Sequence, residues 1–90
     1  MSARALILMK SFKKDIRKHY LHLATPEWAE VLSCLVSNLP LERKYQDHAL
    51  TGEWKGFRDC HVKPDLVLIY KIVENDLELH HLDSHSEIFG

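Results

Sequence analysis

Histidine and carboxylate side chains that could transfer protons recur through the second half of this 90-residue chain. His48 lies in a polar segment, His61 and Asp65 flank a Lys-Pro turn, and His85 lies near the end of the sequence. Histidine suits general acid–base chemistry because its unperturbed pKa, about 6.5, is close to physiological pH. A carboxylate can orient and polarise an imidazole, as Asp65 could do for His61 or His48. By residue type, these four residues are therefore candidates for proton transfer in a catalytic site.

Structural interpretations compete with these assignments. Taken alone, His48 is typical of a solvated loop residue, and His61 of a surface residue beside a turn. Arg58 offers a planar guanidinium group that matches phosphate oxygens. Its neighbour Asp59 should point to the opposite face of a strand, so we interpret Asp59 as structural.

Positive charge is concentrated at the start of the chain, although the formal net charge is −1. Residues 1–22 contain six basic residues and one acidic residue (+5), and the remainder contains six basic and twelve acidic residues (−6). Lys13 and Lys14 fall in the first turn of a predicted helix, where the helix dipole disfavours cations. This placement favours a binding role for an anion or an acidic partner, although a solvated helix face is the commoner case.

Composition excludes several classes of protein. A hydrophobic content of 46% and a charged content of 28% fit a folded domain and not a disordered chain. Ninety residues predict one domain, residues 1–90, with a shallow surface groove. No apolar run approaches the ~18 residues that span a bilayer, and no export signal is recognisable, so we expect a cytoplasmic protein without membrane contact. Cys34 and Cys60 are predicted to be free thiols.

Periodic patterns predict the element order strand, helix, helix, strand, strand, strand. Ser11 is the predicted N-cap of the first helix, and Thr25 followed by Pro26 opens the second. The predicted segments are a strand at 4–9, helices at 12–23 and 26–39, a loop at 41–51, and strands at 53–62, 66–73 and 77–83.

This order predicts an α+β fold with two layers. The short link at Thr25-Pro26 predicts a helical hairpin, which packs on one face of a mainly antiparallel sheet. Residues 66–72 are apolar on both faces, which predicts a central strand. Trp54 and Phe57 are interpreted as core residues, and the face of the sheet without helices is the predicted working surface.

Three segments of the chain resemble the YafQ branch of the RelE/ParE toxin superfamily. They are residues 10–15, residues 45–70 and the closing Ser-His-x-x-apolar-Phe-Gly segment at 84–90. The middle segment contains Asp-His-x-Leu-x-Gly from Asp47 and Arg-Asp-x-His-Val-x-Pro-Asp from Arg58. The resemblance covers nearly the whole chain and implies a RelE-like fold.

The resemblance also implies the toxin of a bacterial type II toxin–antitoxin system. Such toxins enter the ribosomal A site and cut mRNA, and a cognate antitoxin binds and neutralises them. Operator DNA would be contacted only through that antitoxin. The family's functional histidines correspond to His48, His61 and His85, its aspartate to Asp65, and its terminal aromatic residue to Phe89.

RNA cleavage agrees with the chemistry of these residues, because the 2′-hydroxyl of RNA supplies the nucleophile. We predict an endoribonuclease that needs no metal or cofactor, in which His85 transfers one proton and His48 and His61 share the other transfer and phosphate contacts. Phe89 could stack on an unpaired base or anchor the tail in the core. The predicted substrate-binding residues are Arg58, Phe89, Lys13 and Lys14.

Three alternatives remain open from the sequence. His81, Asp83 and His85 alternate along one strand face and could bind zinc or another transition metal. A ParE-like toxin would inhibit DNA gyrase without cleaving RNA. The same groove could instead dock a partner peptide.

Overall fold

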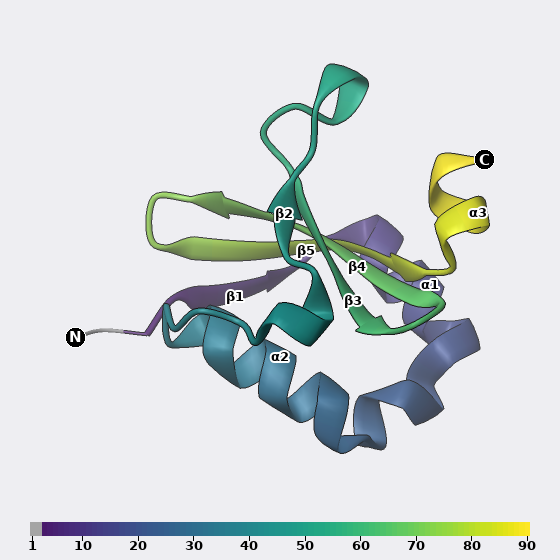
Figure 1. The fold of residues 1–90 in the computed structure, drawn as a ribbon, viewed down its shortest axis with the longest axis horizontal. Helices are drawn as coiled ribbons and strands as arrows, with labels where there is room; N and C mark the ends of the chain where they lie inside the picture. Colours follow the sequence, from purple (N-terminus) through teal and green to yellow (C-terminus); the bar gives the residue numbers. More distant parts are fainter. Residues whose placement is uncertain (1–2) are drawn as a thin grey trace.

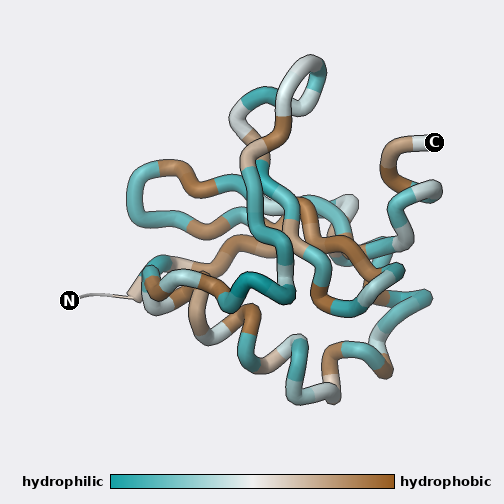
Figure 2. Tube along the Cα trace, in the orientation of Figure 1, coloured by the Kyte–Doolittle hydropathy of each residue, from teal (hydrophilic) through white to brown (hydrophobic). Residues whose placement is uncertain are grey.

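Strand β4 (Leu66–Val73) lies at the centre of the structure, and its first five residues are all buried. The computed structural model describes residues 3–90, which form a five-stranded sheet in the order β1-β5-β4-β3-β2 (Figure 1). Strand β1 (Ala5–Leu8) is parallel to β5 (Asp76–Asp83), and all other pairs are antiparallel. Figure 2 shows strongly hydrophobic residues along β4, as expected for a strand covered on both faces.

Two helices cover one face of the sheet and confirm the predicted α+β class. They are α1 (Lys10–His19) and α2 (Pro26–Val36). Phe12 of α1 and Trp28 of α2 stack with their ring centroids 6.0 Å apart and belong to the buried core. Thr25 caps α2 as predicted, because its Oγ1 accepts a hydrogen bond from the Trp28 N–H at 3.4 Å. The link between the helices is longer than predicted, since Tyr20–Ala24 form a separate 3-10 helix, η1.

Helix α1 lies beside β5. Two of its polar side chains form hydrogen bonds with backbone groups of β5 that a neighbouring strand would otherwise bind. The Ser11 hydroxyl donates to the His80 carbonyl at 2.5 Å, and the Leu82 N–H donates to the Asp15 carboxylate at 3.1 Å. The prediction that Ser11 is an N-cap is therefore wrong. Met9 occupies the cap position, and Ser11 lies inside the helix and turns toward the sheet.

The segment between the helices and the central strands is more ordered than predicted. The predicted loop at 41–51 contains the 3-10 helix η2 (Arg43–Tyr45) and the short strand β2 (His48–Ala49). Strand β3 (Arg58–Lys63) begins later than predicted, because Gly52–Trp54 form the 3-10 helix η3. Residues 50–57 form an arm that extends away from the body of the sheet between β2 and β3 (Figure 1).

A short helix that was not predicted, α3 (His85–Phe89), follows β5. Its N-cap is Ser84, whose hydroxyl accepts a hydrogen bond from the Glu87 N–H at 3.2 Å. None of the helices in residues 3–90 has the length and apolar character needed to cross a membrane.

Asp83 joins the end of α1 to the end of β5. One carboxylate oxygen accepts from Lys18 Nζ at 2.8 Å, and the other lies 2.9 Å from His19 Nε2 and accepts from the Ser84 N–H at 2.8 Å. Burial raises the pKa of Asp83, but the hydrogen bonds from Lys18, Ser84 and His19 outweigh burial and bring the pKa to about 2. Asp83 therefore stabilises the fold in its ionised form.

We predict that Asp83→Asn lowers the free energy of unfolding by about 2 kcal/mol at neutral pH. Because the folded pKa is depressed, the contribution of Asp83 is complete above its unfolded pKa of about 3.9 and disappears as the pH falls toward about 2. Urea unfolding across this range should show a steeper pH dependence for the original chain than for the variant. Asp76→Asn, at the other end of β5, is the matched control and should keep the pH dependence of the original chain. The prediction would be contradicted if the stability of Asp83→Asn depended on pH as steeply as that of the original chain.

Candidate active site

The face of the sheet opposite α1 and α2 carries titratable side chains around a small apolar centre. Alternate residues of a strand face the same side, so Asp59 and His61 share this face, whereas Arg58 faces the helices. Val67 and Ile69 are fully buried but lie outside the core cluster that contains the helices. The strand register gives two rows across β3, β4 and β5, namely Asp59–Ile69–His81 and His61–Val67–Asp83.

An open hollow of about 300 Å³ lies where β2, the arm and α3 meet. It brings together His48 from β2 and His85 from α3, which are separated by 36 intervening residues in the sequence. Both imidazoles belong to exposed residues, so a ligand in the hollow could reach them. The residues that line the hollow are His48, Leu50, Thr51, Trp54, Asp59, His85 and Phe89.

His48 is oriented by the backbone and lies beside a buried carboxylate. Its Nδ1 is 2.7 Å from the Gln46 carbonyl oxygen and 3.0 Å from Asp59 Oδ1. A carbonyl oxygen can only accept a hydrogen bond, so the contact with Gln46 is a hydrogen bond when the proton of the neutral ring is on Nδ1. This arrangement leaves His48 Nε2 available to accept a proton.

Asp59 is the electrostatic centre of the site, and only 2% of its surface is exposed. Burial raises the pKa of Asp59 above its ordinary value, although His48, His61 and His85 act in the opposite direction. All three predicted histidines therefore lie close enough for their charges to act on this carboxylate. The sequence interpretation placed Asp59 on the strand face opposite Arg58, where it lies, but did not place it in the hollow beside His48. The sequence did indicate that Asp59 lies on the same strand face as His61, because the two residues are two positions apart.

Aromatic contacts hold α3 against the arm. The Phe89 ring centroid lies 5.5 Å from that of Trp54 and 4.7 Å from that of His85. Trp54 also contacts Phe57 edge to face at 5.4 Å. Trp54 is half-buried and lines the hollow, so the interpretation of Trp54 as a core residue is wrong. The two aromatic residues Trp54 and Phe89 form one wall of the site.

His61 and Asp65 lie farther from the hollow than predicted. His61 lines a separate hollow of about 670 Å³, together with Lys44 and Lys63. Asp65 is exposed in the turn between β3 and β4, and among residues 3–90 it makes no side-chain hydrogen bond to a histidine. The carboxylate beside a catalytic candidate is therefore Asp59, and the geometry gives no support for Asp65 as a partner of His48.

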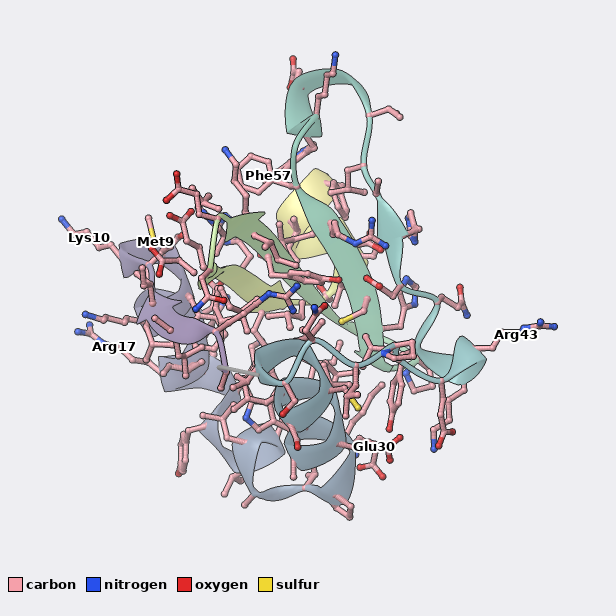
Figure 3. The ribbon with its side chains drawn as sticks, turned by 90° about the vertical axis from the view of Figure 1, so that its left-hand side faces the viewer. Met9, Lys10, Arg17, Glu30, Arg43 and Phe57 are labelled. Carbon is pink, nitrogen blue, oxygen red and sulfur yellow. The ribbon has the colours of Figure 1, made fainter. Side chains whose placement is uncertain are left out.

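The predicted substrate-binding residues other than Phe89 lie outside the hollow. Arg58 faces the helices, where its Nη2 donates to Asp47 at 3.1 Å and its Nε donates to Tyr70 at 3.2 Å. Lys13 and Lys14 lie on α1 beside another hollow, of about 680 Å³. In Figure 3, the labelled Lys10 and Arg17 project from this same side of the molecule.

The structure separates the three residues of the metal alternative. His81 Nδ1 lies 3.0 Å from an Asp15 oxygen, and Asp83 is bonded to Lys18 and His19, whereas His85 lies beyond the strand in α3. Within residues 3–90, no three His, Cys, Asp or Glu side chains are grouped so that they could hold a metal ion.

The cysteines contribute no nucleophile to the site. Both are free thiols, as predicted, and Cys60 is fully buried on the helix side of β3. Burial raises the pKa of the Cys60 thiol, which keeps it in the unreactive protonated form.

Comparison with protein families gives a match over nearly the whole chain. The family described as bacterial toxin of type II toxin-antitoxin system, YafQ, matches residues 4–90. A putative toxin YafQ of Haemophilus influenzae is 49% identical over 65 residues, which are 68% of this chain and 64% of that protein. The mRNA interferase toxin YafQ of Escherichia coli K12 is 44% identical over 61 residues, which are 67% of this chain and 66% of that protein. The matched part of the chain thus spans just under two thirds of these two relatives.

Solved structures agree with this match. A copper-bound mutant toxin from Helicobacter pylori superimposes with a TM-score of 0.88 at 45% identity, covering 96% of this chain and 99% of that one. The toxin chain of the E. coli DinJ-YafQ complex gives a TM-score of 0.83 at 35% identity, covering 97% of this chain and 99% of that one.

We predict that Asp59→Asn stabilises the fold at neutral pH by about 1–3 kcal/mol, because the nearby His48, at 3.0 Å, offsets the cost of burying the ionised carboxylate only in part. The folded pKa of Asp59 is raised, so its cost is complete above that pKa and falls as the pH decreases toward the unfolded value. The gain measured by urea unfolding should therefore be larger at about pH 7 than at about pH 4.

The exposed Asp65→Asn is the control for the Asp59 variant and should leave stability unchanged. A loss of stability in Asp59→Asn at about pH 7 would show that the ionised carboxylate stabilises the fold, contrary to this prediction.

Proposed function

Because this chain belongs to the YafQ family of bacterial toxins of type II toxin–antitoxin systems, we propose that it is a ribosome-dependent mRNA endoribonuclease that inhibits translation without a metal ion. The observation that carries the proposal is the meeting of His48, Asp59 and His85 in one open hollow. The relative from E. coli K12 is an mRNA interferase toxin, which supports RNA as the substrate. The DinJ-YafQ complex of another relative supports a cognate antitoxin as partner.

The reaction needs two proton transfers, and the hollow contains two exposed imidazoles for them. One imidazole removes the proton of the 2′-hydroxyl, whose oxygen attacks the adjacent phosphorus. The bond from phosphorus to the 5′-oxygen breaks, a 2′,3′-cyclic phosphate forms, and the other imidazole protonates the 5′-oxygen. His48, with Nε2 as acceptor, suits the role of base, which leaves His85 as the acid. Asp59 favours the imidazolium form that His48 adopts after it has taken the proton.

The surroundings of the hollow fit a single strand of RNA. Trp54 and Phe89 offer aromatic surfaces on which a base can stack. His61 lines the neighbouring hollow with two lysines, and we assign it to contacts with an adjacent phosphate. Asp65, exposed in the turn between β3 and β4, has no assigned role in the proton transfers.

We predict that His85→Ala and His48→Ala each lower the cleavage of translated mRNA by about 10²–10⁴-fold, because each removes one proton transfer. Cleavage should be measured by primer extension on an mRNA that is being translated in a reconstituted system. His22→Ala is the matched control, since His22 lies in η1 outside the hollow, and it should cleave at the original rate.

Full cleavage by the His85→Ala protein would exclude this assignment. Addition of EDTA to the reaction should leave the rate unchanged once ribosomal magnesium is restored. Loss of cleavage that only one transition metal rescues would instead favour a metal centre. Growth arrest with DNA damage, and with intact mRNA, would favour the gyrase-directed alternative.

The cationic face of α1 is a second part of the proposal, because it can dock the protein on ribosomal RNA. Lys10, Lys13, Lys14 and Arg17 are all exposed, and none forms an ion pair with another residue in the described part of the chain. By contrast, Lys18 on the same helix is paired with Asp83. Unpaired cations grouped on one helix suit the phosphate backbone of RNA, whose counterions are released on binding.

We predict that the double variant Lys13→Ala with Lys14→Ala weakens ribosome binding and lowers the slope of log K against log salt by about 1–2, because two phosphate contacts are lost. Co-sedimentation with ribosomes over a series of salt concentrations measures both quantities. The control is Arg43→Ala with Lys55→Ala, which removes the same charge from exposed positions; Arg43 projects from the opposite side of the molecule (Figure 3). Equal salt slopes for the two double variants would contradict a specific role of α1.

A further inference from the structure

Two side-chain pairs cross between the segment that carries His48 and strand β3, one on each face of the sheet. On the helix face, Arg58 Nη2 donates to Asp47 Oδ2 at 3.1 Å. On the opposite face, His48 Nδ1 lies 3.0 Å from Asp59 Oδ1. The sequence Asp47-His48 therefore faces Arg58-Asp59, with an acid opposite a base in each pair. The backbone register agrees, since His48 is paired with Asp59 across β2 and β3.

Tyr70 of β4 completes the cluster on the helix face. Its side chain is 1% exposed, its hydroxyl donates to Asp47 Oδ1, and Arg58 Nε donates to its oxygen at 3.2 Å. Each oxygen of Asp47 thus accepts from one donor. Burial and the bond to Asp47 raise the pKa of Tyr70, and the bond to Asp47 raises the pKa of Arg58, so both donors keep their protons.

The backbone between this cluster and the imidazole has little freedom of its own. Gln46 adopts φ 51° and ψ 42°, a left-handed conformation that is strained for a residue other than glycine. This conformation directs the Gln46 carbonyl to His48 Nδ1, at 2.7 Å. Strand β2 has only two residues, so few ladder hydrogen bonds oppose a change in this turn. The side-chain bonds of Asp47 lie directly between the strained residue and His48.

We propose that Asp47, Arg58 and Tyr70 are positioning residues for His48, and that they act through the backbone from the face of the sheet opposite the hollow. The hydrogen bonds from Arg58 and Tyr70 fix Asp47, and this keeps the Gln46 carbonyl in place. The carbonyl in turn keeps the proton on His48 Nδ1 and leaves Nε2 directed to the hollow. The activity part of this inference rests on the proposed ribonuclease function, whereas the orientation of His48 can be measured without substrate.

Tyr70→Phe tests the inference, because it removes only the hydroxyl that donates to Asp47. We expect kcat for mRNA cleavage to fall about tenfold or more with KM unchanged, since a misplaced base affects the chemical step and not substrate binding. Nitrogen-15 NMR of the His48 ring in the free protein should show a smaller share of the Nδ1-protonated form. The control is Tyr20→Phe, which should change neither quantity, because Tyr20 is exposed in η1 and lines neither of the hollows assigned to RNA.

A folded Tyr70→Phe protein with unchanged His48 ring signals and unchanged kcat would overturn the inference, even if the protein were less stable. Altered ring signals with unchanged kcat would support positioning and would contradict the catalytic role of His48, so the two proposals can fail separately. Should Tyr70→Phe not fold, Asp47→Asn is the second variant. The Asp47 side chain is 24% exposed, so its substitution disturbs the core less than that of the buried Tyr70. We expect the same changes in kcat and in the His48 ring signals.

Discussion

Burial of β4 on both faces is the constraint on which the rest of the structure depends. A strand that is apolar on two sides must be covered on two sides, and α1 and α2 supply the cover on one of them. On the other side, the short α3 and the arm are the cover that residues 3–90 provide, and the neighbouring strands place Asp59, His61 and His81 beside Val67 and Ile69. The titratable groups thus lie next to a small apolar centre because this face of the sheet is covered less than the face under α1 and α2. The candidate active site lies where α3 and the arm cover the sheet.

Much of this fold could be predicted because its patterns are local. The apolar run of β4, the cap at Thr25 and the helical period of α2 all lie within single segments. Strand β4 and the cap are found where predicted, and α2 begins where predicted but ends at Val36, three residues before the predicted end. Features that depend on contacts between residues far apart in the sequence could not be predicted. Ser11 has the residue type of an N-cap, but its hydroxyl bonds a carbonyl 69 positions away, on β5. Strand β2 is ordered by pairing with β3, and its two residues carry no strand pattern of their own.

The site follows the same division. The resemblance of the sequence to a toxin family singled out His48 and His85, and the structure places both in one hollow. The resemblance selected Asp65 as the functional aspartate, whereas the carboxylate that lies beside His48 is Asp59. Burial distinguishes the two, since Asp59 is enclosed by neighbouring strands and Asp65 is exposed in a turn. The residue type of Arg58 fits phosphate, but strand alternation turns its side chain toward Asp47 and Tyr70, so its role in substrate binding stays a prediction.

The side chains of α1 that bond the edge of β5 also bear on self-association. The edge of β5 is paired with β1 over its first half, and over its second half Ser11 and Asp15 occupy the backbone groups that a strand from another molecule would need. An open edge of this kind is a template for aggregation, and a helix laid over it removes that template. Two small polar side chains thus protect solubility as well as the fold, and they do so beside the cationic residues that give α1 its charge.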